Sequence, residues 1–180
     1  MISIIIPTIK KDLGVTGKSI KKYTKDYEIV TSNAKGFNNA INDCVRKAKG
    51  DYLVFMHDDI EVTKGWADKL DDCGVFLVGE FDGEMDIWGA YYHGTYNTDI
   101  NAHPDYSFFM CLSKKVADKV FPLDTNFKSP WCQDVDFGLS LKKKGHIINC
   151  LPGRVIHHHK GEHIEQKENE DYLDRKWLGW

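Results

Sequence analysis

Short apolar runs recur along this chain of 180 residues and are separated by segments of mixed polarity. The first run, Ile2 to Ile6, is rich in β-branched residues, and Pro7 ends it. A continuous apolar run of this length is typical of a strand that is buried on both faces of a parallel sheet. Runs of the same kind predict further strands at residues 27–31, 51–56, 75–78, 108–112, 147–151 and 154–157.

Helical periodicity appears between these runs. It is clearest from Asn38 to Lys49, where apolar residues recur at helical spacing and Gly50 follows as the expected C-cap. Further helices are predicted at residues 12–23, 66–73, 114–120, 131–144 and 162–180. The last of these is expected to pack through Tyr172, Leu173 and Trp177. This alternation predicts a Rossmann-like α/β fold, with a central, mostly parallel sheet flanked by helices.

The composition is that of an ordinary globular protein, with 42% hydrophobic and 28% charged residues, and the length suits a single domain over residues 1–180. A net charge of −3 provides no large basic field, which argues against nucleic acid as a partner. Five cysteines without a Cys-x-x-Cys pair indicate free, mostly buried thiols in a reducing compartment. With no secretory leader and no apolar run near the ~20 residues of a membrane span, we expect a cytoplasmic protein.

The first motif with chemical potential is His57-Asp58-Asp59, which follows the predicted strand at 51–56. Ligands bind beyond the carboxyl ends of strands in open α/β sheets. Carboxylates at such a position suit a divalent ion such as Mg²⁺ or Mn²⁺ that bridges a diphosphate. A solvated turn or a helix N-cap would explain the same residues.

A second motif, Gln133-Asp134-Val135-Asp136, opens the predicted helix at 131–144. Asp134 and Asp136 are two positions apart and cannot share one helix face, so one can point into a cleft while the other braces the segment. A carboxylate beside a reacting hydroxyl can act as a general base. Acidic residues that favour a helix N-terminus are the alternative interpretation.

The third motif is the histidine run at 157–159, which follows a predicted strand. In an extended segment His157 and His159 share a face and His158 opposes them, so the three cannot be assumed to act together. One of them could complete a metal site with Asp59, or the run could be a polar loop. A fourth, softer motif is the loop at 32–40, where Lys35 and a helix N-terminus could face a phosphate, although an ordinary capped helix start would explain the same residues.

The order of these motifs is more informative than any one of them. An apolar strand with Pro7-Thr8 comes first, then the segment 33–42, and then the segment 50–59 with its acidic end. The motif at 133–136 and the histidines follow downstream. This order resembles the GT-A glycosyltransferases of the family 2 type, over roughly residues 1–160.

The resemblance implies a GT-A fold and an enzyme that moves a sugar from a nucleotide-diphosphate sugar, with UDP-sugars favoured, to a hydroxyl acceptor. It implies a hexosyl- or pentosyltransferase, inverting by analogy with the family. Residues 1–100 would bind the nucleotide sugar, and residues 101–180 would supply the acceptor and catalytic part. The pocket for acceptor and donor sugar would be shaped by the aromatic residues Trp88, Tyr91, Tyr92, Tyr96 and Tyr106.

Individual roles follow from the resemblance by position. Donor binding is implied for Pro7, Thr8, Asn33, Lys35, Gly36, Asn38, His57 and Asp58. Asp59 would bind Mn²⁺ or Mg²⁺ on the donor diphosphate, with His157 and His159 as further candidate ligands. Asp134 would be the base that deprotonates the acceptor hydroxyl.

Three positions depart from the family pattern. His57 stands where the first Asp of an Asp-x-Asp motif is expected, Gln133 stands where Glu is usual, and residues 31–33 replace an acidic turn. Two other functions are therefore kept open. One is a nucleotidyltransferase, for which residues 9–18 supply Gly and Lys, and the other is a degenerate module that binds carbohydrate without turnover.

Overall fold

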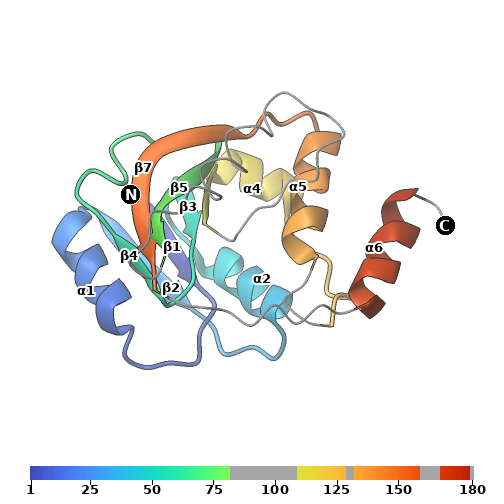
Figure 1. Cartoon of the computed structure of the whole chain (residues 1–180), viewed down its shortest axis with the longest axis horizontal. Coiled ribbons are helices and arrows are strands. Elements are labelled where there is room, and N and C mark those ends of the chain that lie inside the picture. The colour runs from blue at the N-terminus through green and yellow to red at the C-terminus, as the bar shows by residue number, and fades with distance from the viewer. Residues whose placement is uncertain (82–108, 129–131, 159–166, 179–180) are drawn as a thin grey trace.

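The computed structural model describes residues 1–81, 109–128, 132–158 and 167–178. Within these residues a seven-stranded sheet has the order β2-β1-β3-β6-β5-β7-β4 (Figure 1). None of the helices in this part of the chain combines the length and apolar character needed to cross a bilayer.

The first half of the sheet is built from a parallel β-α-β-α-β unit. It comprises β1 (Ile2–Ile6), α1 (Gly14–Tyr23), β2 (Tyr27–Thr31), α2 (Phe37–Lys47) and β3 (Tyr52–Phe55). β1 lies between β2 and β3 and pairs in parallel with both. Because Ile4, Ile5 and Ile6 are fully buried, this central strand is covered on both faces, as its continuous apolar run predicts.

The second half of the sheet is mixed in direction. Its strands are β4 (Ile60–Val62), β5 (Cys73–Phe81), β6 (Met110–Ser113) and β7 (Asn149–His157), and its helices are α4 (Lys114–Val120), α5 (Gln133–Lys143) and α6 (Lys167–Leu178). β6 is antiparallel to β3 and β5, β7 is parallel to β5, and β4 is antiparallel to β7. Five described strands therefore run in one direction and only β4 and β6 oppose them, which agrees with the predicted, mostly parallel α/β sheet.

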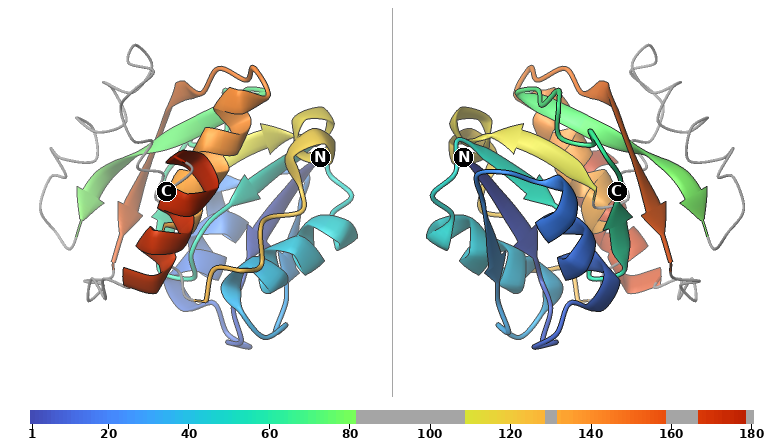
Figure 2. Two further views of the ribbon diagram at one scale, coloured as in Figure 1. Left: turned by 90° about the vertical axis from the view of Figure 1, so that its right-hand side faces the viewer. Right: turned by 90° about the vertical axis from the view of Figure 1, so that its left-hand side faces the viewer.

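Two apolar cores lie on opposite faces of this sheet. Helices α2, α4 and α5 cover one face, where Ile41, Ala117 and Leu141 are almost completely buried. Helix α1 covers the other face, where Ile20 packs with Trp66 and strand residues (Figure 2). The helices thus form layers on both sides and leave the carboxyl ends of β1 and β3 at one edge of the sheet.

Several predicted details differ from the structure. Residues 66–73 form turns leading into β5 and not a helix, because Trp66 is drawn into the core, where its indole Nε1 donates to Thr24 Oγ1 at 3.0 Å. Two strands predicted at 147–151 and 154–157 are the single strand β7. The three-residue strand β4 had no separate signal in the sequence.

Gly50 is not a helix C-cap, because α2 ends at Lys47 and is capped by Ala48. Its role is to allow the chain to pass close to β1, where the Gly50 amide donates to Ser3 Oγ at 2.7 Å. A Cβ at this position would lie 2.5 Å from the Ser3 backbone nitrogen. This contact leaves no room for a side chain.

Gly50→Ala is therefore expected to destabilise the protein by about 1–3 kcal/mol through overpacking against β1. Urea unfolding followed by circular dichroism measures this loss. Lys49→Ala, at the exposed neighbouring position, is the matched control and should stay within about 0.5 kcal/mol of the unsubstituted protein. Equal stability of the two variants would show that β1 can move away at no cost.

The cysteines are consistent with the predicted free thiols. Cys44, Cys73 and Cys111 are buried and Cys132 is half-buried, and none of these four forms a disulfide. Burial raises the pKa of Cys111 and of Cys73 to about 12, which keeps both thiols protonated and unreactive. They pack as small apolar residues.

Candidate functional site

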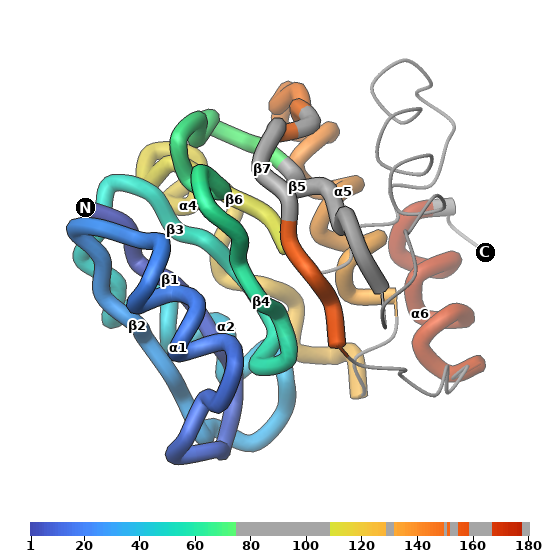
Figure 3. Tube along the Cα trace, turned by 60° about the vertical axis from the view of Figure 1, so that its left-hand side comes forward, coloured from blue at the N-terminus to red at the C-terminus, as the bar shows by residue number. Residues whose placement is uncertain are grey.

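Pairing between β4 and β7 assembles the centre of the site. The chain leaves β3 at Phe55, passes through His57-Asp58-Asp59 and enters β4, which pairs with the end of β7 (Figure 3). In this register Ile60 lies opposite His157, and the His158 amide donates to the Asp59 carbonyl at 3.1 Å. Two segments a hundred residues apart are thus brought into contact, and His157 is placed beside Asp59.

His57, Asp59 and His157 form a compact group of potential metal ligands. Their ligand atoms all lie within 4.8 Å of one another, and His157 Nε2 is 3.3 Å from Asp59 Oδ1. The side chains of Asp59 and His157 are 23% and 20% exposed, so both are mostly buried but still reached by solvent. His57 is also in edge contact with the rings of Phe37 and His157.

The electrostatics of this group keep Asp59 ionised. Burial by itself would raise the pKa of Asp59, but the hydrogen bond and charge of His157, together with the charge of His57, outweigh burial and lower the pKa. The carboxylate is therefore available as a ligand at neutral pH. Two ligands on opposite sides of an ion lie about 4.3 Å apart when each bond is about 2.1–2.2 Å. Small side-chain movements would thus bring all three residues onto one divalent ion, and the donor set fits such an ion.

Asp58 is directed to a different part of the site. Its carboxylate accepts a hydrogen bond from Thr8 Oγ1 and forms an ion pair with Lys10 Nζ at 3.0 Å. These contacts connect the end of β3 to the loop after β1. A cleft of about 370 Å³ opens beside this contact. Its lining residues are Pro7, Thr8, Ile9, Lys10, Ser32, Ala34, Gly36, Phe37, Ala40 and Asp58.

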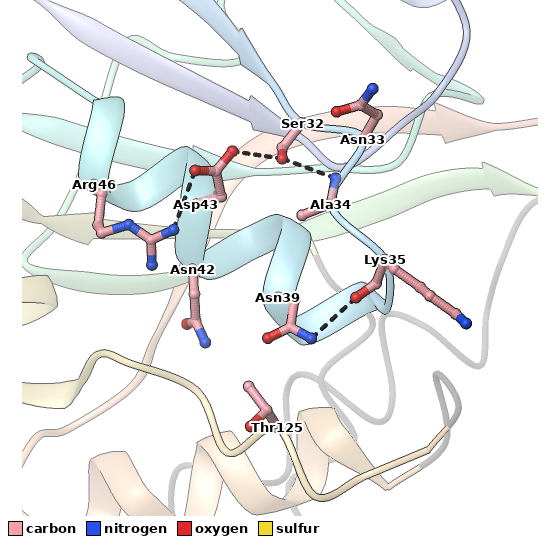
Figure 4. A pocket seen from close by; sticks show the side chains of 9 residues that line it. All are labelled: Ser32, Asn33, Ala34, Lys35, Asn39, Asn42, Asp43, Arg46 and Thr125. Carbon is pink, nitrogen blue, oxygen red and sulfur yellow. Dashed lines mark hydrogen bonds and ion pairs between the residues drawn. The ribbon is translucent and has the colours of Figure 1, made fainter.

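A second, more polar cleft of about 560 Å³ adjoins the first, and Ser32 and Ala34 line both. Its lining residues are Ser32, Asn33, Ala34, Lys35, Asn39, Asn42, Asp43, Arg46 and Thr125 (Figure 4). Ser32 Oγ donates to Asp43 Oδ2 at 2.6 Å and accepts from the Ala34 amide at 3.2 Å. The hydrogen bond from Lys47, with a smaller contribution from that of Ser32, lowers the pKa of Asp43 to about 2. The orientation of Ser32 is therefore fixed by a permanently charged partner.

Asn38, one of the predicted donor-binding residues, is not among the residues that line these clefts. It is 4% exposed, and its Nδ2 donates to the Asp124 carbonyl at 2.6 Å. Asn42 exchanges two hydrogen bonds with the Leu123 backbone, at 3.0 and 2.7 Å. Asn38 and Asn42 therefore hold the loop at 121–127.

Asp134 and Asp136 open α5 and have different surroundings. Asp136 is 5% exposed and accepts hydrogen bonds from Trp177 Nε1 at 2.8 Å and from Lys176 Nζ. Asp134 is half-buried, and its Oδ1 accepts from the Val135 amide at 2.9 Å. Asp136 thus braces α5 against α6, as expected for one of the pair.

Lys176 joins α6 to two other segments. Its Nζ lies 2.8 Å from Asp136 Oδ1 and 2.7 Å from Asp124 Oδ2, and the Tyr172 hydroxyl also donates to Asp124. Burial alone would raise the pKa of Asp124, but the hydrogen bonds from Lys176, the Asn126 amide and Tyr172 lower it to about 2. With Leu173 buried, all three residues expected to pack the last helix make tertiary contacts.

Lys176→Ala is expected to reduce stability at pH 7 by about 1–3 kcal/mol, because two largely buried carboxylates lose a charged hydrogen-bond donor. The depressed pKa of Asp124 stabilises the fold above the unfolded value of 3.8, and this contribution is lost as pH falls towards 2. The variant should therefore lose less stability than the unsubstituted protein between these pH values. Urea unfolding across this range tests the effect, with exposed Lys167→Ala as control, and parallel curves for all three proteins would contradict it.

Some residues of the site had no distinct signal in the sequence. Thr125 and Lys10 reach the clefts only through the tertiary fold, and Asp43 appeared as an ordinary helix residue. His159 and the aromatic residues between 88 and 106 lie outside the described residues.

Comparisons with known proteins agree with the fold. Residues 15–72 match the sequence model of a family described as Glycosyl transferase family 2. The structure of S. aureus TarS 1-349 superposes with a TM-score of 0.63 at 14% identity, covering 83% of this chain and 57% of that one. GalNAc-T7, solved with UDP, GalNAc and Mn²⁺, superposes with a TM-score of 0.67 at 12% identity, covering 99% of this chain and 48% of that one. No curated protein sequence matches the chain significantly.

These likenesses identify the class in which the fold falls. The mixed sheet with helices on both faces is that of the GT-A proteins, and the fold expected from the order of motifs is confirmed. The match to the Glycosyl transferase family 2 model is confined to residues 15–72. The chain spans roughly half the length of the two solved structures, at 57% and 48%.

Proposed function

We propose that this chain is a metal-dependent glycosyltransferase that moves a sugar from a nucleoside-diphosphate sugar to a hydroxyl acceptor. The observation that carries the proposal is the convergence of His57, Asp59 and His157 at the sheet edge that also holds the cleft beside Asp58. A cation site next to a cleft suits a ligand with a planar base at one end and a diphosphate at the other. The GT-A fold and the family match support the same class of reaction.

In this proposal the donor lies along the edge formed by the loops after β1, β2 and β3. Pro7, Thr8 and Gly36 line the cleft that would take the nucleoside, and Asn33 and Lys35 line the adjoining polar cleft. Asp58, fixed by Thr8 and Lys10, would contact the ribose or the sugar. UDP-sugars are the favoured donors, and residues 1–100 would form the donor-binding part of the domain.

The proposed cofactor is Mn²⁺ or Mg²⁺, held by Asp59 and His157 with His57 as a further ligand. A divalent ion at this position supplies charge stabilisation for the diphosphate that leaves with the nucleoside. Residues of the chain keep the ligands in place, because the β4–β7 pairing fixes Asp59 and His157 before any ligand binds. This preorganisation limits the side-chain movement that the ion requires.

Asp134 is proposed as the general base of an inverting transfer. It would accept the proton of the acceptor hydroxyl while the hydroxyl oxygen forms a bond to the anomeric carbon and the bond to the diphosphate oxygen breaks. The brace between Asp136 and α6 would hold the first turn of α5, and therefore Asp134, in a constant position. Residues 101–180 would form the acceptor and catalytic part.

A thermal-shift screen followed by product analysis tests the proposal. UDP-, GDP- and dTDP-sugars are each added with Mn²⁺, Mg²⁺ or EDTA, since a ligand that binds the native state raises the melting temperature. A metal-dependent shift with one nucleotide class, and release of nucleoside diphosphate with an acceptor, are expected. Binding without any turnover would indicate the carbohydrate- or nucleotide-sugar-binding module, and release of pyrophosphate from a nucleoside triphosphate would indicate a nucleotidyltransferase.

A further inference from the structure

Helix α1 presents lysines and one valine on its outer side. Its exposed residues are Val15, Lys18, Lys21 and Lys22, and these four form the basic face of α1. They recur at spacings of three and four, so their side chains share one side of the helix. The opposite side packs on the sheet through Ile20. Because α1 lies in front of the sheet in the right-hand view of Figure 2, the basic face is turned outward.

Positive charge is concentrated around this face. Residues 9–26 contain six Lys and two Asp, whereas the whole chain has a net charge of −3, so the other residues together carry −7. Lys11 and Lys25 flank α1 and are exposed as well. Within the described part of the chain, the ion pairs involve neither these two lysines nor the three of the basic face. The charges of these five residues are therefore available to an external partner.

Lysines on two other helices are held by contacts within the molecule. Lys114 forms an ion pair with Asp118 along α4, and Lys144 Nζ donates to the Lys119 carbonyl. Lys143 Nζ, at the end of α5, lies 5.4 Å from the centroid of an indole ring on α6. Helix α1 differs from α4 and α5, because its ammonium groups have no carboxylate partner among the described residues.

Exposed aliphatic side chains near these lysines favour a lipid surface as the partner. Ile9 is 85% exposed and Val15 is 40% exposed, although both are apolar. Residues 9–26 contain no Arg, whose planar fork matches the phosphates of nucleic acids, and Tyr23 is half-buried rather than exposed for base stacking. A membrane supplies negative headgroups for the lysines and an apolar layer for the aliphatic side chains. A soluble polyanion supplies only the negative charge.

We propose that the basic face of α1, together with Ile9, docks on a membrane surface that contains anionic phospholipids. Lysines clustered on a helix are attracted to such a surface, and each contributes about a fivefold increase in affinity. The other side of α1 stays packed on the sheet, so docking requires no unfolding. Ile9 also lines the smaller of the two clefts, so the docked protein holds this cleft at the lipid surface. The proposal concerns binding alone and does not depend on the transfer of a sugar.

Co-sedimentation with lipid vesicles tests the proposal. One set of vesicles contains phosphatidylcholine alone, and the other contains equal parts of phosphatidylcholine and phosphatidylglycerol. We expect the protein to bind the anionic vesicles at least about tenfold more tightly at low ionic strength. This preference should be lost in about 0.5 M NaCl, because salt screens exposed charges. Equal binding to both sets, or no binding to the anionic vesicles at low ionic strength, would overturn the proposal.

Two matched triple variants separate the basic face from the overall charge. Replacement of Lys18, Lys21 and Lys22 by Gln should lower the affinity for anionic vesicles by about a hundredfold. The control replaces the exposed Lys115, Lys119 and Lys143 of α4 and α5 by Gln, which removes the same charge elsewhere. The affinity of the control should stay within about threefold of that of the unsubstituted protein. Equal losses in the two variants would assign the binding to net charge and overturn the proposal.

A further variant distinguishes a lipid surface from a soluble polyanion. Ile9→Ser should weaken binding to anionic vesicles by about fivefold or more, because an apolar contact is lost, and should leave binding to heparin unchanged. Binding to heparin without binding to anionic vesicles would assign the basic face to a soluble polyanion and overturn the proposal.

Lysine acetylation of the unsubstituted protein decides the question even where a triple variant does not fold. Anionic vesicles should protect Lys18, Lys21 and Lys22 from the reagent and leave the lysines of α4 and α5 reactive. Protection of neither group, or equal protection of both, would overturn the proposal.

Discussion

Asp134→Asn should lower the turnover of sugar transfer by about 10²–10⁴-fold, the usual contribution of a general base. Donor affinity should be unchanged, because Asp134 begins α5 and does not belong to the ligand cluster or to the residues that line the two clefts. The amide keeps the size of the carboxylate and its hydrogen bond from the Val135 amide, so the helix start should be preserved. The kcat for transfer and the Kd for the donor, measured by calorimetry, give the two quantities.

The control for this prediction is a second carboxylate near the same turn. Asp134 and Asp174 both lie close enough to Cys132 for their charges to act on its thiol. Burial raises the pKa of this thiol to about 12, and the charges of Glu170, Asp134 and Asp174 contribute further. Asp174 is exposed on α6. Asp174→Asn therefore changes the local charge by the same amount and should retain turnover. Normal turnover in Asp134→Asn would remove Asp134 from the role of base, and a loss shared equally by both variants would point to local charge instead.

Asp59→Ala is expected to abolish metal-dependent donor binding. The variant removes the only carboxylate of the ligand cluster and leaves two imidazoles to hold the ion. A divalent ion contributes several kcal/mol to the stabilisation of a charged leaving group. We therefore expect turnover to fall by at least about 10³-fold. Donor at a hundred times its Kd stabilises the native state by about 2.7 kcal/mol, which raises the melting temperature of the unsubstituted protein. Most of this rise should be lost in Asp59→Ala.

Glu61→Gln provides the comparison for Asp59→Ala. Glu61 lies on β4 two residues from Asp59, and its carboxylate pairs with His158 rather than joining the ligand cluster. This variant should keep its metal-dependent shift. An Asp59→Ala protein whose donor affinity responds to Mn²⁺ as before would exclude Asp59 as a ligand.

Local sequence patterns predict much of the fold, because the spacing of apolar residues reflects which faces of a strand or helix are buried. The bounds of β1, β2 and α4 follow directly from a β-branched run, a second short apolar run and a helical repeat. The helix expected at 66–73 is wrong, since tertiary burial of Trp66 outweighs the helical spacing of its neighbours. The C-cap predicted at Gly50 is wrong for a similar reason, because the close approach of β1 to Gly50 cannot be recognised in the flanking sequence.

The residue types of the candidate site could be predicted from the sequence, but the contacts between its side chains could not. The acidic motif at 57–59 and the histidine run were recognisable, but only the register of β4 on β7 places His157 beside Asp59 and turns His158 towards Glu61. The contrasting surroundings of Asp58 and Asp59 depend on Lys10, a residue of a distant loop. The contacts of Asp136 with Trp177 likewise join segments about forty residues apart. Such long-range pairings cannot be inferred from local spacing.

The position of β4 has a consequence for how the protein is made. During synthesis the parallel unit of β1, β2 and β3 leaves the ribosome early and already contains the β1–β2 and β1–β3 pairings. The edge strand β4 pairs only with β7 among the described strands, and it must wait until residue 157 has been translated. A nascent chain therefore carries His57 and Asp59 without their third partner for about a hundred residues. If the proposed ion binds at this site, truncated products that lack β7 should be unable to retain it.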